Sequence, residues 1–182
     1  EIDFLQTVPT NGFINFALSD KFLNEQISRI NEAYGKNDYG QNKKVLLEFV
    51  SANPTGPLHI GHGRWAALGD SVARILSEIG YDVKKEFYIN DAGNQINKFN
   101  ESVDAARKGE TIPEDGYHGA YIKDLAEIDK DPVKEMLSDQ EKVLADFRCD
   151  FDRWFSETEL HKKNSVNELI DVLKEKNICY EK

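Results

Sequence analysis

The chain has 182 residues, of which 40% are hydrophobic and 31% charged, which fits one globular domain or a small domain joined to part of a larger one. No apolar run approaches the ~18 to 20 residues of a membrane-spanning helix, so we expect no membrane contact. The net charge of −10 excludes a broadly basic nucleic-acid surface. Cys149 and Cys179 lack metal-ligand spacing and are too few for a disulfide framework, which favours a reducing, cytoplasmic location.

Both ends of the sequence look as if they lie inside a longer gene product. The first residues contain no initiating Met and no signal peptide pattern. The last six, residues 177–182, resemble the start of a strand after a helix. We therefore expect a fragment.

Residues 1–35 predict a small α+β piece. Strands over residues 2–8 and 12–18, joined by a Pro-Thr-Asn-Gly turn, form a hairpin. Ser19 or Asp20 then caps a helix that Gly35 ends, since apolar residues recur at spacings of 4, 3 and 4: Leu23, Ile27, Ile30 and Tyr34. The polar, aperiodic residues 36–42 are expected to form a linker.

Residues 43–182 predict an α/β fold, in which a Rossmann-like parallel sheet carries helices on both faces. Residues 45–50 read as a strand buried on both faces, and residues 82–89 as a second strand. Between them a helix begins near Leu58 and ends before Gly80, which suits a C′ position. Residues 43–89 therefore form a βαβ unit. The helix carries an apolar stripe: Trp65, Leu68, Val72, Ile75, Leu76 and Ile79.

A helical insertion is expected at about residues 95–148. The first helix has the apolar residues Ile96, Phe99, Val103 and Ala106. A polar loop over residues 108–119 precedes helices near 120–128 and 132–147, the last opened by Asp131 as cap and Pro132. A strand over residues 151–155 follows. The final amphipathic helix is marked by Val166, Leu169, Ile170 and Leu173.

The junction between the first strand and the first helix of the βαβ unit is the candidate site, because open α/β sheets bind ligands beyond the carboxyl ends of their strands. His59 and His62 lie three residues apart at the helix start, where the positive end of the helix dipole suits phosphate. Gly61 and Gly63 let a base or ribose approach the backbone. A His-x-x-His pair alone is a common pattern, and a zinc site is disfavoured because no third ligand follows at zinc spacing.

Three stretches resemble the arginyl-tRNA synthetases, a family of class I aminoacyl-tRNA synthetases. The first stretch, residues 48–62, reads Glu-Phe-Val-Ser-Ala-Asn-Pro-Thr-Gly-Pro-Leu-His-Ile-Gly-His and contains the His-Ile-Gly-His signature of that class. Residues 88–95, Tyr-Ile-Asn-Asp-Ala-Gly-Asn-Gln, and residues 151–157, Phe-Asp-Arg-Trp-Phe-Ser-Glu, match later family segments. Residues 12–16 resemble the end of the additional N-terminal, tRNA-contacting domain of arginyl enzymes.

The resemblance implies a role for each matching residue. His59, Gly61, His62 and Gly63 would bind ATP, and the two histidines would stabilise the transition state of adenylate formation. Arginine would be bound by Asn53 at its α-amino group, by Glu157 at its guanidinium, with Glu48, Asp91 and Gln95 lining the cleft. The signature segment, residues 52–62, comprises Ala52, Asn53, Pro54, Thr55, Gly56, Pro57, Leu58, His59, Ile60, Gly61 and His62.

The residues themselves leave two of these roles open. Glu48 is the only charged residue in residues 45–50, so its buried carboxylate needs a partner. That partner is either a cationic substrate or, equally well, Arg64 or backbone N–H groups. Glu157 is one of 33 acidic residues, and by composition alone it belongs on a solvated surface. A planar guanidinium nevertheless requires a carboxylate of this kind.

The function that the resemblance implies is ATP-dependent ligation of L-arginine to tRNA(Arg) through arginyl-adenylate. It would use ATP with Mg²⁺ as substrate, no tightly bound cofactor and no metal site on the protein, in a full-length enzyme that is a monomer. We expect this piece alone to be inactive. One alternative is a synthetase for another amino acid, or another His-x-Gly-His nucleotidyltransferase. A second is a non-catalytic, synthetase-like binding module.

Overall fold

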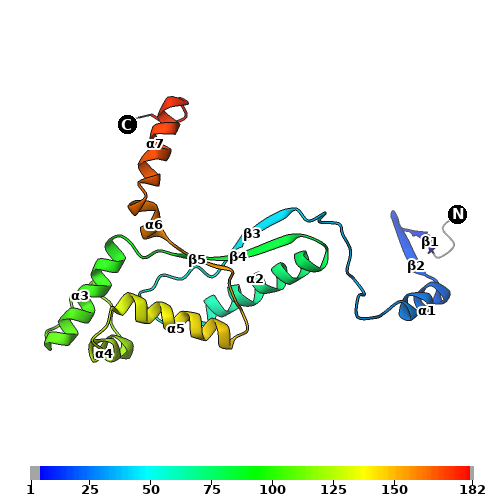
Figure 1. Ribbon diagram of the computed structural model, residues 1–182. Coiled ribbons are helices and arrows are strands. Elements are labelled where there is room, and N and C mark those ends of the chain that lie inside the picture. Colours follow the sequence, from blue (N-terminus) through cyan, green and yellow to red (C-terminus); the bar gives the residue numbers. More distant parts are fainter. Residues whose placement is uncertain (1–4, 181–182) are drawn as a thin grey trace.

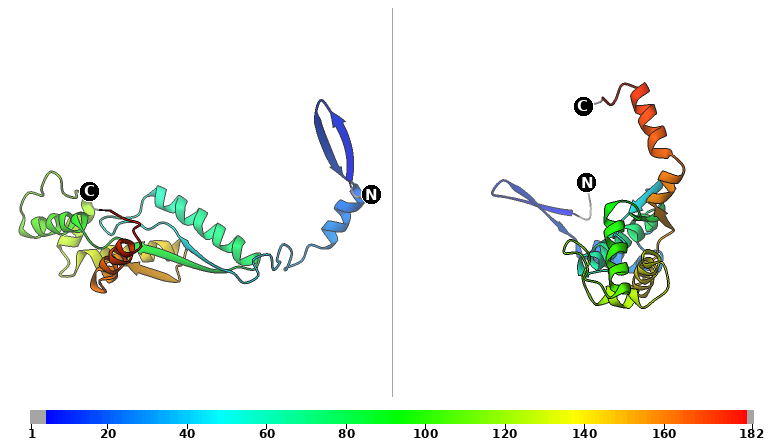
Figure 2. Two further views of the ribbon diagram at one scale, coloured as in Figure 1. Left: turned by 90° about the horizontal axis from the view of Figure 1, so that it is seen from above. Right: turned by 90° about the vertical axis from the view of Figure 1, so that its left-hand side faces the viewer.

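The computed structural model describes the backbone of residues 5–180 and the side chains of residues 11–180. An N-terminal piece, a sheet with its helices and a C-terminal helix follow one another along the chain (Figure 1). The N-terminal piece stands apart from the rest in Figure 1 and in the left view of Figure 2. The site must therefore be sought in the part that contains the sheet.

The N-terminal piece contains the predicted hairpin. β1 (Leu5–Thr10) pairs antiparallel with β2 (Phe13–Leu18), and residues 2–4 of the predicted first strand lie outside the described residues. α1 (Asp20–Ser28) is capped by Ser19, whose Oγ accepts a hydrogen bond from the Phe22 N–H at 3.2 Å.

The predicted extension of α1 to Gly35 is wrong. The helix ends at Ser28, and Asn31 Oδ1 accepts a hydrogen bond from the Ala33 N–H at 2.8 Å. Asn side chains compete in this way with the backbone carbonyls of a helix. The apolar period thus continues beyond the point where the helix stops.

The sheet has three parallel strands in the order β3-β4-β5. β3 (Lys44–Glu48) and β4 (Asp82–Ile89) are joined by α2 (Ile60–Glu78), which confirms the βαβ unit. β5 (Arg153–Ser156) pairs with the other edge of β4 and begins two residues later than predicted. As predicted, the chain leaves α2 through Gly80, whose φ is +90°.

The prediction that β3 is buried on both faces is wrong. β3 is an edge strand of the described sheet, and its residues alternate between exposed and half-buried. Leu46 is 61% exposed. An apolar run predicts a strand, but whether helices cover both of its faces depends on residues far away in the sequence.

The apolar stripe of α2 also lies largely in the open. Trp65, Leu68 and Ile75 are each more than half exposed, and α2 buries the small residues Ala66 and Ala73 instead. Small side chains let the helix approach the sheet closely. The helical period is therefore correct, but it does not identify the face that packs in this chain.

The predicted helices of the insertion are all present. α3 (Asn94–Lys108) and α4 (Ala120–Ala126) pack together, and α5 (Pro132–Asp146) follows. As predicted, Asp131 caps α5, because its Oδ1 accepts hydrogen bonds from the N–H groups of Val133 and Lys134. The three helices share a hydrophobic cluster, the insertion cluster, which is formed by Phe99, Val103, Ile122, Leu125 and Met136.

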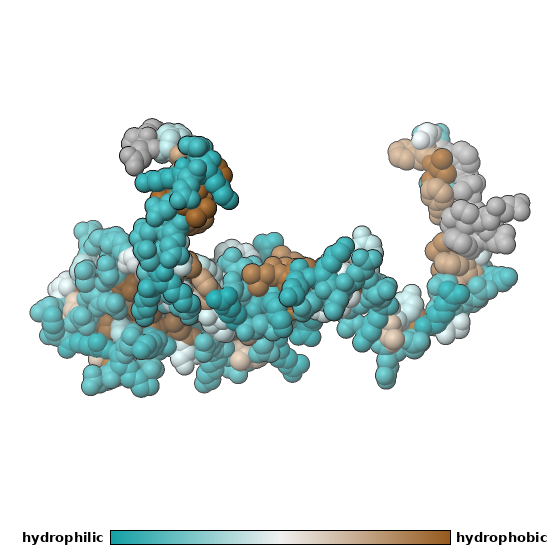
Figure 3. All heavy atoms as spheres, turned by 45° about the horizontal axis from the view of Figure 1, so that its top comes forward, coloured by the Kyte–Doolittle hydropathy of each residue, from teal (hydrophilic) through white to brown (hydrophobic). Residues whose placement is uncertain are grey.

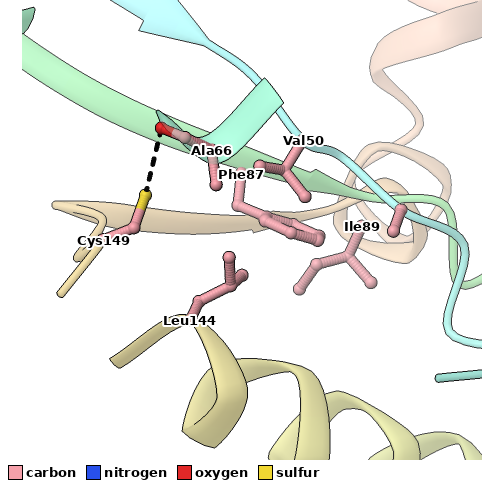
Figure 4. Packing of buried hydrophobic residues seen from close by; sticks show 7 residues of the cluster. Val50, Ala66, Phe87, Ile89, Leu144 and Cys149 are labelled. Carbon is pink, nitrogen blue, oxygen red and sulfur yellow. Dashed lines mark hydrogen bonds between the residues drawn. The ribbon is translucent and has the colours of Figure 1, made fainter. Parts of the chain in front are cut away.

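A second hydrophobic cluster, the sheet cluster, joins the sheet to α2 and α5 (Figure 4). Phe87 of β4 is fully buried beside Val50, and Leu144 of α5 faces it. The thiol of Cys149 donates a weak hydrogen bond, 3.8 Å long, to the carbonyl oxygen of Ala66. α5 therefore contributes to both clusters and connects the insertion rigidly to the sheet.

The remaining helices rise from the other side of the sheet (Figure 1). α6 (Glu157–Lys162) is not predicted from the sequence, whereas α7 (Ser165–Glu175) is the predicted final helix. Residues 177–180 form no strand, so the strand predicted for residues 177–182 is wrong in its described part. Residues 181 and 182 lie outside the described residues.

Hydrophobic surface is visible on the N-terminal piece and along the C-terminal helix (Figure 3). Phe13 and Phe16 are 74% and 66% exposed, and Leu169 of α7 is 57% exposed. Within residues 5–180 there is no helix of the length and apolarity needed to cross a bilayer.

Candidate active site

The chain bends sharply where β3 ends and the signature segment approaches. Val50 and Ser51 have φ values of +66° and +40°, in the left-handed region that a β-branched residue such as Val rarely adopts. Val50 is nevertheless buried in the sheet cluster, which holds it in this conformation. Strained backbone of this kind concentrates at functional sites.

His59 and His62 form a stacked pair at the start of α2. His59 is the N-cap residue, and its Nδ1 accepts a hydrogen bond from the Gly61 N–H at 3.1 Å. The His59 N–H in turn donates to His62 Nδ1 at 3.2 Å, and the two ring centroids are 3.8 Å apart. In the neutral rings the proton must therefore sit on Nε2. Both Nε2–H groups remain free of protein partners among the described residues.

This arrangement disfavours a positive charge on His62. The pKa of His62 is lowered by partial burial and, secondarily, by the neighbouring His59. A neutral His62 still donates one hydrogen bond through Nε2. The helix start therefore offers two imidazole donors beside the positive end of the α2 dipole, which is a suitable environment for a phosphate.

Asn53 and Gln95, two predicted binding residues that are 42 positions apart, are in direct contact. Asn53 Nδ2 donates a hydrogen bond to Gln95 Oε1 at 2.6 Å. Asn53 lies in the signature segment and is exposed, and Gln95 lies in the first turn of α3. The two residues therefore form one polar edge beside the ends of β3 and β4.

Glu48 is exposed, so the expectation of a buried carboxylate is wrong. Its hydrogen-bond partner is a neighbour that the sequence did not suggest. The Ser51 hydroxyl donates to Glu48 Oε1 at 2.5 Å and accepts from the Tyr88 N–H at 3.1 Å. Among the described residues Glu48 makes no ion pair with Arg64, and it accepts no hydrogen bond from a backbone N–H. Ser51 thus links the predicted carboxylate at the end of β3 to the backbone of β4.

Asp91 anchors the turn after β4 to the start of α6. Its carboxylate accepts hydrogen bonds from the Ser156 hydroxyl at 2.5 Å, and from the Thr158 N–H and hydroxyl at 2.9 Å each. Partial burial alone would raise the pKa of this carboxyl group, but the hydrogen bonds outweigh burial and hold the pKa below its ordinary value. The carboxylate is thus already engaged with protein donors.

Glu157 is the first residue of α6. In the orientation that satisfies its neighbours, the Asn90 amide donates to Glu157 Oε2 at 2.7 Å, and His161 Nε2 lies 3.6 Å from Glu157 Oε1. The pKa of Tyr88 is raised first by partial burial, then by Glu157, and further by the charges of Asp91 and Glu48. The carboxylates of Glu48, Asp91 and Glu157 therefore form an anionic corner around Tyr88.

Two residues of the insertion reach the signature segment without any signal in the sequence. Gln140 Nε2 donates to the carbonyl oxygens of Asn53 and Gly56, at 3.1 and 2.9 Å. The Tyr121 hydroxyl donates to the carbonyl oxygen of Thr55 at 3.0 Å. Both lie more than 60 residues from their partners, so no local motif could have indicated them.

A cleft of about 370 Å³ opens beside His59, between the start of α2 and the end of α5. It is lined by Leu58, His59, Gly63, Val143, Leu144, Asp146 and Phe147. In the part of the chain that the structure describes, no three His, Cys, Asp or Glu side chains are grouped closely enough to hold a metal ion.

A parallel sheet whose first strand–helix junction carries His-Ile-Gly-His is the arrangement of a class I tRNA synthetase catalytic domain. The family model described as "tRNA synthetases class I (R), catalytic domain" matches residues 25–182. The chain belongs to this family, the arginyl-tRNA synthetases.

Known proteins support this assignment in sequence and in structure. The chain is 44% identical to the arginine–tRNA ligase of Shouchella clausii over 200 residues, and 45% identical to arginine–tRNA ligase 1 of Halalkalibacterium halodurans over 199 residues. These matches cover 94% and 93% of this chain. A solved structure from Campylobacter jejuni, assigned to the arginyl-tRNA synthetases, superposes with a TM-score of 0.72 at 33% identity. It covers 91% of this chain and 42% of that chain.

The chain spans 36% of the length of the two curated relatives named above. The Thermus thermophilus arginyl-tRNA synthetase shares the fold at a TM-score of 0.61 and 23% identity, over 95% of this chain and 33% of that chain. The activity of the relatives as whole enzymes is therefore only proposed for this protein.

Proposed function

We propose that the protein carrying this sequence ligates L-arginine to tRNA(Arg) through an arginyl-adenylate made from ATP. The observation that carries the proposal is the stacked His59–His62 pair at the start of α2, with both Nε2–H groups free of partners among the described residues, together with the anionic corner around Tyr88. Phosphate and guanidinium have opposite charges, and these two environments suit one each.

In the proposed reaction, the arginine carboxylate attacks the α-phosphorus of ATP and forms an acyl-phosphate bond, while the phosphoanhydride bond between the α- and β-phosphates breaks and pyrophosphate leaves. The Nε2–H groups of His59 and His62 donate hydrogen bonds to phosphate oxygens, where negative charge grows in the transition state. Gly61 and Gly63 allow the nucleotide to approach the α2 backbone. Positioning and electrostatics carry the catalysis, without a covalent enzyme intermediate.

Mg²⁺ is proposed to arrive with ATP. Mg²⁺ that accompanies a nucleotide is held mainly by substrate phosphates and water. When bound, the ion would neutralise phosphate charge.

The anionic corner is proposed to bind arginine. Glu157 would accept hydrogen bonds from the guanidinium, with Glu48 contributing negative charge beside it. Asn53, held by Gln95, would contact the α-amino group. Asp91 is proposed to border this cleft as the anchor of α6, because its oxygens are already hydrogen-bonded to Ser156 and Thr158.

The remaining proposals concern the protein's surroundings. Family membership supports tRNA(Arg) as the partner. We further propose that the N-terminal piece contacts this tRNA and that the full-length enzyme is a monomer. We also propose a cytoplasmic location, which is supported by two free cysteines, the buried Cys149 and the exposed Cys179.

The test is ATP–pyrophosphate exchange by the full-length gene product, with and without tRNA, using arginine against lysine and citrulline. Exchange that requires arginine, strongest with tRNA, is the expected result, because a guanidinium-reading corner rejects both controls. Exchange with another amino acid would retain the nucleotide site but overturn the assignment of arginine. An absence of exchange with every amino acid would favour a non-catalytic binding module.

A further inference from the structure

The first part of the signature segment contains three buried residues and forms few hydrogen bonds within its own backbone. Ala52 and Thr55 are 5% and 7% exposed, and Pro54 is fully buried. Apart from the turn at Pro54 and Thr55, the backbone of residues 52–58 makes no hydrogen bond to another backbone group in the part of the chain that the structure describes. The carbonyl groups of Asn53, Thr55 and Gly56 are partly buried, and carbonyl groups withdrawn from water require hydrogen-bond donors.

The insertion supplies these donors. Gln140 of α5 and Tyr121 of α4 together donate to three carbonyl oxygens within four residues, those of Asn53, Thr55 and Gly56. One primary amide spans two of these carbonyls, so it sets the shape of the turn between them. Asn53 itself and the chain leading to His59 are therefore placed by α5.

Gln140 is unusual among the buried residues. Its side chain is fully buried, and its Oε1 is buried without a hydrogen-bond partner among the described residues. An unpaired buried acceptor is unfavourable, and an apolar side chain would avoid it. The two N–H groups are what an apolar residue of this size could not provide.

We propose that Gln140 is a positioning residue for adenylate formation, with Tyr121 as a second support. It acts by fixing the segment that carries Asn53 and leads into His59. The catalytic consequence rests on the proposed function, whereas the fixing of the segment does not. The two can therefore be tested separately.

The first experiment measures how often the segment opens in the full-length protein. A Thr55→Cys reporter is reacted with a thiol reagent, and labelling is read by peptide mass spectrometry. Cys149, only 2% exposed in the sheet cluster, serves as an internal measure of general opening. Adding Gln140→Met should speed labelling at position 55 by on the order of 10-fold and leave Cys149 unchanged, because the shape is kept and two donors are lost.

Two further variants distinguish selective opening of the segment from a general loss of stability. Tyr121→Phe removes a single hydroxyl and should produce a smaller increase at position 55. Met136→Ala, one turn earlier in α5 within the insertion cluster, should lower the unfolding temperature without a selective increase at position 55. Equal labelling rates with Gln and Met at position 140, or parallel increases at positions 55 and 149, would overturn the proposal.

The second experiment measures arginine-dependent exchange in proteins without the reporter. Gln140→Met should lower kcat/KM by on the order of 10-fold, and Met136→Ala should leave it unchanged below its unfolding temperature. Unchanged kcat/KM in an active Gln140→Met enzyme would overturn the positioning role. If the unaltered protein fails to activate arginine, the proposed function fails, and the labelling ratio still decides whether Gln140 fixes the segment.

Discussion

His59 has two roles that replacement by alanine would confuse. Its Nδ1 caps α2 by accepting from the Gly61 N–H, while its Nε2 faces away from that bond and is proposed to bind phosphate. Loss of the cap lowers stability, and loss of Nε2 lowers the rate. Because these two nitrogens belong to one ring, only a substitution that keeps an N-cap acceptor separates them.

We therefore predict different outcomes for His59→Asn and His59→Ala. Both should lower the rate of arginine-dependent exchange by on the order of 10²-fold, because both remove a transition-state donor. Only His59→Ala should also lose about 1 kcal/mol of unfolding free energy, since Asn is a good N-cap residue. Urea unfolding and exchange kinetics measure the two effects. Full activity in His59→Asn would refute the proposed phosphate contact.

The lowered pKa of the Asp91 carboxyl group determines how this residue makes the unfolding free energy depend on pH. Its folded pKa lies below the ordinary value of 3.8, so the folded state favours the charged carboxylate. This contribution is complete at pH values above 3.8. It disappears as the pH falls through the lower folded pKa, because the folded protein must then take up a proton that the unfolded chain already carries.

Asp91→Asn should therefore lower the unfolding free energy at pH 7 by about 1 to 2 kcal/mol, with a modest value because the carboxylate is only half-buried. The difference from the unaltered protein should shrink as the pH drops below about 4. Urea unfolding at several pH values measures both. A difference that stays constant down to pH 2 would contradict the assigned hydrogen bonds.

Within α2, two glycines six residues apart meet different surroundings. A Cβ atom at Gly69 would overlap the Phe49 ring, which packs against Phe151 at 4.6 Å between ring centroids. A Cβ atom at Gly63 would meet no atom within 4 Å. The close approach of α2 to the end of β3 therefore depends on Gly69.

The same substitution should consequently have opposite effects at these two positions. Gly63→Ala should stabilise the protein by about 0.5 to 1 kcal/mol, because Ala is the better helix former. Gly69→Ala should destabilise it, since overpacking costs typically 1 to 3 kcal/mol and exceeds that gain. Thermal unfolding distinguishes them, and a higher unfolding temperature for Gly69→Ala would show that α2 does not pack as described.

In the molecule as a whole, the connection between the N-terminal piece and the sheet lies nearer the N-terminus than the polar composition of residues 36–42 suggests. Residues 36–42, predicted as a linker, are hydrogen-bonded to the end of α2. The N–H groups of Asn37, Gly40 and Asn42 donate to three successive carbonyl oxygens, those of Glu78, Ile79 and Gly80. The domain boundary stays a prediction, and these bonds place any flexible joint before residue 37.

We predict that limited trypsin treatment cuts first after Arg29, which is exposed and follows the last residue of α1. Exposed segments outside regular structure are the preferred sites of proteolysis. Mass spectrometry should then detect a fragment that begins at Ile30 before any cut appears within residues 44–156. Early cuts inside that range would show that the sheet with its insertion is less stable than the joint.

Local patterns were sufficient for much of this protein. Alternation and helical periods correctly placed the hairpin, the βαβ unit, the insertion helices and α7, and the caps Ser19 and Asp131 marked helix starts. The candidate nucleotide site could also be predicted, because His59 and His62 share one short segment. Local turn chemistry at Asn31, which ends α1 early, was the main failure of this kind.

Only the tertiary structure decided which side chains are buried and which residues form hydrogen bonds with each other. The apolar residues of β3 and α2 correctly indicated a strand and a helix. Leu46 and Leu68 are nevertheless exposed, because no described segment covers them. Likewise, Ser51 as partner of Glu48, the anchor of Asp91 and the support by Gln140 were not foreseen. A backbone period is a property of neighbouring residues, and the sequence alone therefore determined the elements and the signature. Contacts between residues far apart in the chain depend on how those elements pack, and only the fold could decide them.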